Sequence, residues 1–471
     1  MKNCIFILIL LSFLNSYAQE IVGPQRLALD DSLSIALFQV NPGVFKNNST
    51  IIWNNKQYLL RKEDTIFTLT HKDTQVKYTA YNTALPLLQI DAPNGIVNEP
   101  KRISTIHYAD SSKTFTSDAG IELRGSSSLF FPKKTYDINF YTDPSGQKNK
   151  DVQLGNLRMD DDWILDGLYN EPIRLRSHLA LSLWREIYTS TYLDKESKAK
   201  SGASTAFCEL FVNGNYKGIY LITEQVDRKL LKLVKEDSTG VRGELFQGSA
   251  YHGAVTFDSI PPKKNYLRRW GGFDIEYPYP NNRPWDNIYP FAETVVNGDE
   301  TAFAKAIEQH INLDNIINYF LFVNAVRAPD NLGKNIYLAR YDRATPYFYV
   351  PWDLDGTFGT IYSGQELDIT NDFLDNGLLR RLLEENPKNF ITRFKARWLE
   401  LRSTVLATDT LVQWQTQQYR EMIKNGAYQR ETLAWNTIDF SQTRLDYMTH
   451  WTTKRLQFLD SYIEKITPIT D

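Results

Sequence analysis

The stretch "IINYFLFVNAV" at residues 316–326 runs directly into "RAPDNLGKN" at residues 327–335. The first part is mostly apolar and has helical character, which predicts a helix buried in the core. The second part is polar, so the chain changes character abruptly at residue 327. A buried helix that ends in a polar loop holds the side chains of that loop at one defined place in the fold.

The polar loop carries Asp330 and Asn335 five positions apart, with Gly333 and Lys334 between them. Protein kinases use Asp-x-x-x-x-Asn in their catalytic loop, where the Asp receives the proton of the substrate hydroxyl and the Asn holds magnesium. The ordinary alternative is a polar turn at the end of a helix. The spacing alone favours that alternative, so other parts of the chain must decide.

The first residues, "MKNCIFILILLSFLNSYAQE", have the pattern of a secretory signal peptide. Lys2 gives the positive start, an apolar run extends from Cys4 to Leu14, and Ser16 and Ala18 are the small residues before cleavage. The apolar run is too short to span a bilayer. We therefore expect residues 1–18 to be removed and the chain to be exported to the periplasm, the cell surface or the medium. No later stretch predicts a membrane span.

Composition excludes several classes of function. The formal net charge is −3, with 53 basic and 56 acidic residues, so no basic surface for nucleic acid is predicted. Cys208 is the only cysteine after the signal peptide, which excludes an internal disulfide and a cysteine-based zinc site. The six histidines show no His-Glu-x-x-His pattern, and no Gly-x-Ser-x-Gly occurs, so zinc and serine hydrolases are not indicated.

The pattern of elements predicts an α+β protein. Residues 19–84 alternate like short strands and predict a small β-rich N-terminal domain. Residues 85–471 begin with further strands and one helix, and end in a mostly helical region from about residue 373. "NGNYKG" at residues 213–218 predicts a hairpin turn between two strands. Asp314 is a plausible cap for the helix that leads into the polar loop.

Two further stretches could serve phosphate chemistry. "RGSSS" at residues 124–128 follows a strand and offers small residues whose backbone N–H groups suit an anion. In "FPKKTYDINFY", which starts at Phe131, Lys134 has the same parity as the apolar Tyr136, Ile138 and Phe140. Strand geometry would turn Lys134 to that face and Lys133 to the other. A lysine that snorkels from the start of a strand is an equally good explanation.

The strand "YFYVPWDLD" at residues 347–355 raises a similar question of parity. Phe348 and Val350 should face the core, whereas Asp353 and Asp355 should project together from the opposite face. Parity cannot choose between the two carboxylates as a metal ligand. The alternative is an acidic turn before Gly356 that binds no metal.

Taken together, these stretches resemble the CotH kinase family of secreted or spore-coat atypical protein kinases. The resemblance covers residues 85–471 and rests on four segments: "RGSSSLFFPKKTYDINFY", "LFVNGNYKGIYLITEQVD", "NAVRAPDNLGKN" and "VPWDLDGTFG". It implies an atypical kinase-like fold with a β-rich small lobe and a mainly helical large lobe, preceded by the small β-rich domain.

The resemblance also implies roles for individual residues. Asp330 is similar to the catalytic Asp of the family. The residues that match the nucleotide side of the family's site are Lys134, Arg124, Gly125, Ser126, Ser127, Glu224 and Arg176. Those that match the metal side are Asp353, Asn335 and Asp355, of which the resemblance favours Asp353 as the magnesium ligand and Asp355 as its support. Glu171 stands where the family commonly has Asp, which puts its role in doubt.

The chain departs from ordinary kinases. It has no Gly-x-Gly-x-x-Gly loop and no Asp-Phe-Gly, and Ala328 and Pro329 stand where a His-Arg pair precedes the catalytic Asp. The expected function is the transfer of phosphate from ATP, with magnesium, to Ser or Thr hydroxyls of a protein. Two alternatives stay open: nucleotidyl transfer on the same fold, and a non-catalytic surface or assembly protein.

Overall fold

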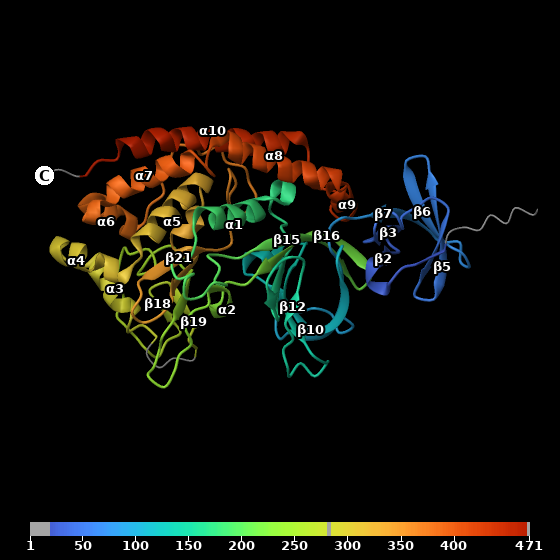
Figure 1. Ribbon diagram of the computed structural model, residues 1–471, viewed down its shortest axis with the longest axis horizontal. Helices are drawn as coiled ribbons and strands as arrows, with labels where there is room; N and C mark the ends of the chain where they lie inside the picture. Colours follow the sequence, from blue (N-terminus) through green and yellow to red (C-terminus); the bar gives the residue numbers. More distant parts are fainter. Residues whose placement is uncertain (1–18, 280–283, 469–471) are drawn as a thin grey trace, which may run out of the picture. The chain divides into compact units, whose positions relative to one another are not determined.

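The computed structural model describes residues 19–279 and 284–468, and it divides the chain into two compact units (Figure 1). Unit 1 consists of residues 19–93, 105–117 and 209–217, and unit 2 takes in the rest. The predicted signal peptide, residues 1–18, lies outside the described residues. Strands prevail in the N-terminal part and helices in the C-terminal part, so the predicted α+β class is confirmed.

Unit 1 contains a seven-stranded sheet in the order β1-β4-β5-β6-β7-β3-β2. Its strands are β1 Gln19–Ile21, β2 Leu27–Asp30, β3 Ile35–Phe38, β4 Ser49–Trp53, β5 Lys56–Glu63, β6 Ile66–His71 and β7 Lys77–Asn82. Buried apolar side chains from these strands, among them Phe38, Ile51 and Leu60, form a core of their own. The β-rich character expected for residues 19–84 is therefore present.

Seven further strands close into a barrel in the order β10-β11-β14-β16-β15-β8-β9. They are β8 Leu87–Asp91, β9 Arg102–Ala109, β10 Thr114–Arg124, β11 Thr135–Tyr141, β14 Asp162–Asp166, β15 Thr205–Val212 and β16 Asn215–Glu224. Asn213 and Gly214 have φ angles of 49° and 72° between β15 and β16. Both lie in the left-handed region that a tight hairpin needs, which confirms the predicted turn.

Unit 2 also holds a five-stranded sheet in the order β18-β19-β17-β20-β21. Its strands are β17 Glu244–Ser249, β18 Arg269–Trp270, β19 Phe273–Tyr277, β20 Lys334–Arg340 and β21 Tyr347–Pro351. A two-stranded sheet pairs β12 Val152–Gln153 with β13 Met159–Asp160. Helix α5, Leu313–Val326, contacts β21 and is buried on nearly all sides. Most of its residues are apolar, and its buried asparagines Asn315, Asn318 and Asn324 donate to backbone carbonyls.

The remaining helices of unit 2 begin with α1 Arg176–Ile187, which fits the helix that the sequence predicts after Glu171. Helices α7, α8 and α10 run together along one side of the unit in Figure 1, and α10 also contacts α5. The helices are α2 Arg228–Leu231, α3 Ile288–Val296, α4 Glu300–His310, α6 Gly377–Glu385, α7 Phe390–Arg402, α8 Thr408–Lys424, α9 Ala427–Ala434 and α10 Gln442–Lys465. Short 3₁₀ turns are η1 Pro24–Arg26, η2 Ser127–Phe130, η3 Pro172–Arg174, η4 Pro329–Leu332 and η5 Pro387–Asn389.

Three local expectations are wrong. Strand β11 begins at Thr135, so its alternation does not reach Lys133 and Lys134. Strand β21 ends at Pro351, and its tyrosines are buried as well as its apolar residues, so it has no polar face to continue toward Asp353. Helix α5 is capped by Asn312, whose side chain accepts a hydrogen bond from Asn315 N at 3.0 Å, and not by Asp314.

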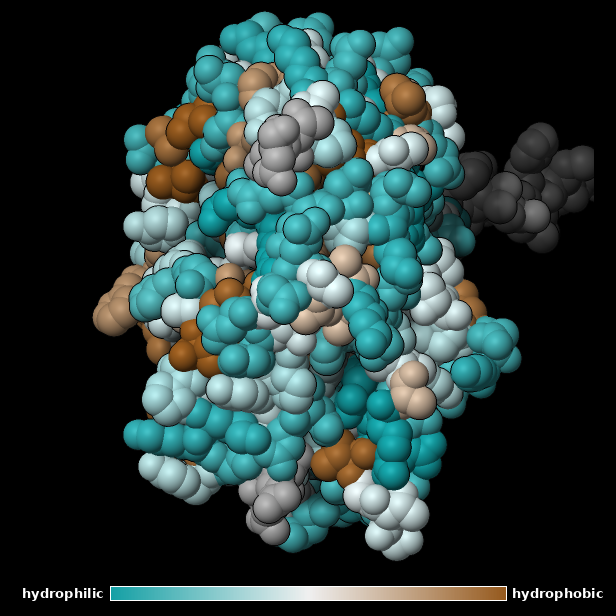
Figure 2. Space-filling view, turned by 90° about the vertical axis from the view of Figure 1, so that its left-hand side faces the viewer, coloured by the Kyte–Doolittle hydropathy of each residue, from teal (hydrophilic) through white to brown (hydrophobic). Residues whose placement is uncertain are grey.

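None of the helices in residues 19–279 and 284–468 combines the length and the apolar character that a membrane crossing requires. Figure 2 shows one face of the molecule, on which hydrophilic residues prevail and apolar residues form small separate groups. Scattered apolar residues of this kind are normal on a protein surface.

Candidate active site

A cleft of about 700 Å³ lies within unit 2. Its lining comes from the end of β10, the start of β11, the end of β14, the start of β20 and the segment after β21. The predicted site residues that line it are Arg124, Gly125, Ser126, Ser127, Asp330, Asn335, Asp353 and Asp355. The fold therefore gathers into one cavity segments that are more than 200 positions apart in the chain.

Antiparallel pairing explains why Asn335 and Asp353 meet. Strands β20 and β21 are neighbours, with Ile336 opposite Pro351, so the start of one strand lies beside the end of the other. The N–H of Trp352 donates to Asn335 O at 3.0 Å just outside this last pair. Asn335 and Asp353 have φ angles of 55° and 52°, a left-handed conformation that Asn and Asp tolerate better than most residues. Both residues thus leave the sheet at the same edge and turn into the cleft.

Hydrogen bonds of the Asn331 side chain hold the loop that carries Asp330 in place. Asp330 lies in the short turn η4, which begins with Pro329. The buried Asn331 donates from Nδ2 to the backbone carbonyls of Asn335 at 2.6 Å and Trp352 at 2.8 Å. Tyr319 of α5 donates to Asn331 O at 2.6 Å. The apolar helix therefore acts as the scaffold that fixes the loop, while Asp330 is left at the surface of the cleft.

The loop at Arg124–Ser128 forms the opposite wall. Gly125 has a φ of 117°, and a Cβ at this position would collide with Ser128, so only glycine fits without rearrangement. Ser126 and Ser127 are exposed. Arg124 lies 5.8 Å from the ring of Trp352 and 3.4 Å from the Asp137 carboxylate. This loop thus lines the cleft with small residues and one guanidinium.

The two neighbouring lysines have different environments. Lys133 lines the cleft but is buried, with Nζ donating to Ile219 O and to Glu431 Oε1, both at 2.6 Å. Burial lowers the pKa of Lys133 to about 8, against the charge of Glu431. Lys134 is half-buried and does not belong to the lining; its Nζ donates to Leu129 O at 2.6 Å. In this structure Lys134 therefore contacts the backbone of η2, next to the loop at Arg124–Ser128.

Glu224 and Arg176 also lie outside the cleft lining. The buried Glu224 carboxylate accepts from Lys200 Nζ at 2.6 Å and from Ser204 N at 3.0 Å. The buried Arg176 guanidinium donates to Thr357 O at 3.1 Å and to Pro172 O at 2.8 Å. Both residues hold chain segments together, and neither is positioned to touch a molecule in the cleft without movement.

Glu171 occupies the start of α1 and not the cleft. Its carboxylate accepts from Arg176 N at 2.7 Å and from Ser177 N at 3.0 Å. A carboxylate at a helix N-terminus satisfies backbone N–H groups that have no partner within the helix. Burial raises the pKa of Glu171 to about 7, although these hydrogen bonds favour its charged form. The longer side chain thus serves as a helix cap.

Burial and the charges of neighbouring carboxylates disfavour ionisation of the acids in the cleft. Asp353 opens into the cleft yet has protein around it, and this partial loss of water, followed by the charge of Asp166, raises its pKa to about 6. Burial and then the charge of Asp353 raise the pKa of Asp355 well above its ordinary value. In the described part of the chain, neither a hydrogen bond nor an ion pair reaches the Asp353 carboxylate. Carboxylates gathered in this way could hold a cation.

The donor set agrees with magnesium. Two carboxylates and the amide oxygen of Asn335 are hard oxygen ligands of the kind that Mg²⁺ prefers. The Asn335 side chain has no hydrogen-bond partner within residues 19–279 and 284–468, so its oxygen is available. Asp355 accepts a hydrogen bond from Asn170 Nδ2, which orients its carboxylate. Asp353 and Asn335 are therefore the residues that would hold the metal, with Asp355 in support.

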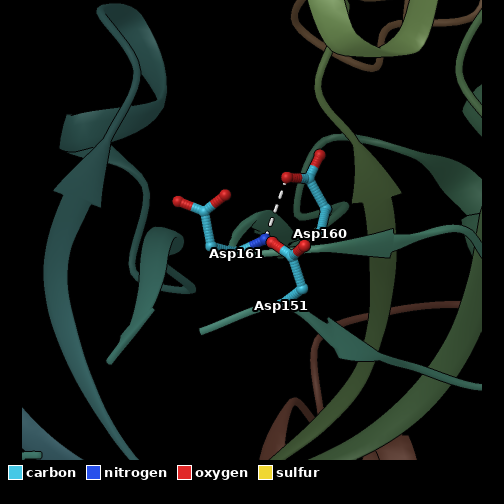
Figure 3. A group of neighbouring side chains, drawn as sticks. All are labelled: Asp151, Asp160 and Asp161. Carbon is cyan, nitrogen blue, oxygen red and sulfur yellow. Dashed lines mark hydrogen bonds between the residues drawn. The ribbon is translucent and has the colours of Figure 1, made fainter. Parts of the chain in front are cut away.

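A second group of acids in unit 2 lies outside the cleft lining (Figure 3). Asp151, Asp160 and Asp161 are close enough together to hold a metal ion. However, Lys229 Nζ donates to both Asp160 and Asp161, at 2.7 Å to the latter, and Arg158 forms an ion pair with Asp160. Two of the three acids thus already have cationic partners, which is typical of a structural ion-pair network.

The structure adds residues to the cleft that the sequence did not indicate. Asp166, Gln247, Tyr251 and Lys334 all belong to its lining. Lys334 stood inside the quoted loop but carried no assigned role. Asp166 ends β14, and its carboxylate accepts from Thr135 Oγ1 at 3.2 Å. Only the position of Asp166 at a strand end could have suggested it, and many acids share that position.

Comparison with known proteins supports the same region. The family model described as CotH kinase protein matches residues 121–459, which is well over half of the chain. Inner spore coat protein H of Bacillus subtilis (strain 168) is 21% identical over 353 residues, covering 74% of this chain and 87% of that protein. The residues that the family model matches include the loop at Arg124, the segment at Asp330 and the acids after β21. The chain belongs to the CotH kinase family.

Proposed function

We propose that this protein is an exported kinase that transfers the γ-phosphoryl group of ATP to Ser or Thr hydroxyls of a protein. The observation that carries the proposal is the composition of the cleft, where a small-residue loop faces Asp330, Asn335 and Asp353. Phosphoryl transfer needs these parts: a loop over the phosphates, oxygen ligands for magnesium and a group that orients the acceptor. Family membership supports the same conclusion.

Asp330 is the group that receives the acceptor proton in this proposal. The acceptor oxygen attacks the γ-phosphorus, and the bond from that phosphorus to the bridging oxygen breaks, so that ADP leaves. The hydroxyl proton passes to an Asp330 carboxylate oxygen. Positioning and electrostatic stabilisation are the main contributions of the protein to such a reaction, and the anchored η4 turn supplies positioning.

The opposite wall binds the nucleotide phosphates. In this proposal the small residues Gly125, Ser126 and Ser127 let backbone N–H groups approach the phosphates. Arg124 adds a positive charge close to Asp353, whose pKa it helps to keep from rising further. Lys134 Nζ would reach the phosphates only after its hydrogen bond to Leu129 O breaks. We still propose Lys134 as the side chain whose positive charge binds the nucleotide phosphates. Glu224 and Arg176 contribute by holding the surrounding segments.

Asp353 and Asn335, with Asp355 in support, would hold magnesium. When bound, the ion neutralises charge on the phosphate oxygens as the transferred group leaves. Residues 353 and 335 are brought together by backbone pairing and not by side-chain contacts. The geometry of these two ligands is therefore built into the sheet.

Two coarser findings support the remaining parts of the proposal. Strands prevail before the helical C-terminal region, which is the order of a β-rich small lobe followed by a helical large lobe, and we propose that the cleft lies between two such lobes. The similar protein from Bacillus subtilis is named as an inner spore coat protein, which fits a location outside the cytoplasm. We propose that residues 1–18 direct the export.

The test is incubation of the purified protein with magnesium and ATP labelled either at the γ- or at the α-phosphate. A degenerate peptide mixture with one central Ser or Thr serves as acceptor. We expect label on the peptide from γ-labelled ATP only. Label from α-labelled ATP would establish nucleotidyl transfer instead. Label from neither would contradict the proposed catalysis and favour a non-catalytic surface or assembly protein.

A further inference from the structure

Tyr251 lies beside the loop that carries Asp330, although the two are distant in sequence. It follows β17, in which Ser249 pairs with Lys334, the residue before Asn335. The backbone of this segment packs directly on the loop, because a Cβ at Gly333 would lie only 2.7 Å from Ala250 O. Gly333 is thus the point at which the two segments touch. The contact fixes the distance between Tyr251 and the residues on either side of Gly333.

The side chain of Tyr251 stands at the mouth of the cleft. It belongs to the cleft lining and is 58% exposed. Lys334 Nζ lies 5.5 Å from the centre of its ring, which is within the range of a cation–π contact. Burial and then the charge of Asp330 raise the pKa of Tyr251, so its hydroxyl is close to that carboxylate.

The ring is on the acceptor side of the site. The loop at Arg124 follows β10 of the barrel, whereas Tyr251 follows β17 of the five-stranded sheet, and Asp330 lies just before β20 of that sheet. An acceptor whose hydroxyl contacts Asp330 must also lie next to Tyr251, because the Tyr251 side chain neighbours Asp330. Aromatic rings contribute large contact area with little loss of side-chain entropy, which makes them common anchors in protein recognition.

We infer that Tyr251 binds the acceptor protein, with its exposed ring as the contact for the chain that carries the Ser or Thr. This inference rests on the proposed kinase function. Lys334 holds one part of the ring, so Tyr251 is oriented before the acceptor arrives. The ring, and not the hydroxyl, supplies the contact area. The aromatic side chain therefore sets how tightly a peptide binds, while nucleotide binding depends on the opposite wall.

The experiment compares Tyr251→Ala, Tyr251→Phe and Tyr279→Ala with the wild-type protein. Tyr279 is equally exposed, at 58%, but does not line the cleft, so it is a matched control. Transfer of γ-label to the degenerate Ser/Thr peptide mixture is measured against peptide concentration and, separately, against ATP. We expect Tyr251→Ala to raise the KM for peptide about tenfold, the factor that corresponds to about 1.4 kcal/mol. The KM for ATP should change less than twofold, and Tyr251→Phe should restore the low peptide KM.

Three outcomes would overturn the inference. An unchanged peptide KM in Tyr251→Ala would show that the ring makes no contact with the acceptor. An equal rise in both KM values would show that the segment after β17 only supports the fold of the site. If the wild-type protein transfers no γ-label at all, the proposed function fails and this inference fails with it. The first two results leave the kinase proposal intact, so the failures are distinguishable.

Discussion

Unit 2 contains two groups of acidic residues that differ in their partners. In the cleft, Asp353 has no hydrogen bond or ion pair among the described residues, and burial, followed by the charge of Asp166, raises its pKa. In the other group, Lys229 and Arg158 contact Asp160 and Asp161 directly. Burial opposes the ionisation of Asp161, but the hydrogen bond and charge of Lys229, together with hydrogen bonds to the side chain of Asp160 and the backbone, outweigh burial and lower its pKa. Acid clusters that look alike in sequence thus differ in whether a cation is already present.

The presence or absence of a cationic partner distinguishes acids that stabilise the fold from acids that could bind a ligand. A carboxylate with a built-in cation stabilises the fold and has little capacity left for a ligand. Carboxylates that repel one another are costly to the fold, and such cost is common where a site awaits a metal or substrate. The same reasoning applies to the lysines, since Lys133 forms an ion pair with Glu431, whereas Lys134 Nζ has no ion-pair partner in the described part of the chain and donates to the backbone carbonyl of Leu129. Five predictions test this contrast.

The largest effect is expected at Asp330. Asp330→Asn keeps the shape of the side chain but cannot accept the acceptor proton, and a general base contributes about 10²–10⁴-fold to rate. We expect γ-transfer to fall by about a thousandfold, with thermal unfolding and nucleotide binding nearly unchanged. A variant that transfers at the wild-type rate would remove Asp330 from the mechanism. A variant that unfolds would favour a purely structural turn.

The next effect distinguishes the two acids after β21. A metal ligand contributes several kcal/mol of transition-state stabilisation, so Asp353→Asn should reduce the rate by about a hundredfold or more. Asp355→Asn should cost less, about tenfold, and excess manganese should rescue part of it. Rates are measured across a magnesium titration. A larger loss in Asp355→Asn would exchange the two assignments, and unchanged magnesium dependence in both would place the metal elsewhere.

The third prediction concerns the neutralised group. Asp160→Asn leaves Lys229 and Arg158 without their shared carboxylate, and lost hydrogen bonds to charged groups cost about 2 kcal/mol. We expect a lower free energy of unfolding in a urea titration and wild-type kinetics at saturating magnesium. A loss of magnesium dependence in this variant would mean that Asp151, Asp160 and Asp161 bind the metal and that the contrast between the groups is false.

The two lysines provide a fourth test. Lys134→Met should weaken ATP binding about tenfold, the effect of about 1.4 kcal/mol, and should leave stability nearly unchanged. Lys133→Met removes the partner of Glu431 and should lower the melting temperature more than it weakens binding. Binding of a fluorescent ATP analogue and thermal unfolding are measured in parallel. Equal weakening of nucleotide binding in both variants would show that ion-pair partners do not separate the two roles.

The smallest effect is expected at Asp162, next to Asp161. Burial and then the charge of Asp137 raise the pKa of Asp162 to about 6. The folded state therefore holds this proton more firmly than the unfolded state, and stability falls as pH rises from about 4 to about 6. Asp162→Asn removes that slope, which should amount to about 1 kcal/mol after allowance for solvent. Urea titrations at pH 4 and pH 7 measure it, and an unchanged slope would contradict the assignment.

Much of the fold was predictable because its signals are local. Apolar residues all round residues 316–326 predicted a buried helix, and α5 is that helix. Alternation after Lys134 predicted β11, and Asn213–Gly214 predicted the hairpin. The loop at Arg124 and the acids after β21 were expected in one site through the family resemblance, and both line the cleft. The limits of each element were less accurate, since a strand can end without any change in residue type.

The sequence by itself determined the α+β class, the main helices and strands, and the group of residues that resembles a kinase site. Only the tertiary structure decided which charges have partners. Lys133 meets Glu431 across 298 positions, and no local pattern indicates such a pair. Alternation could not orient Asp353, because β21 ends at Pro351 and the backbone then turns left-handed. Periodicity describes a side chain only while its element lasts, and pairing between distant segments depends on the whole fold.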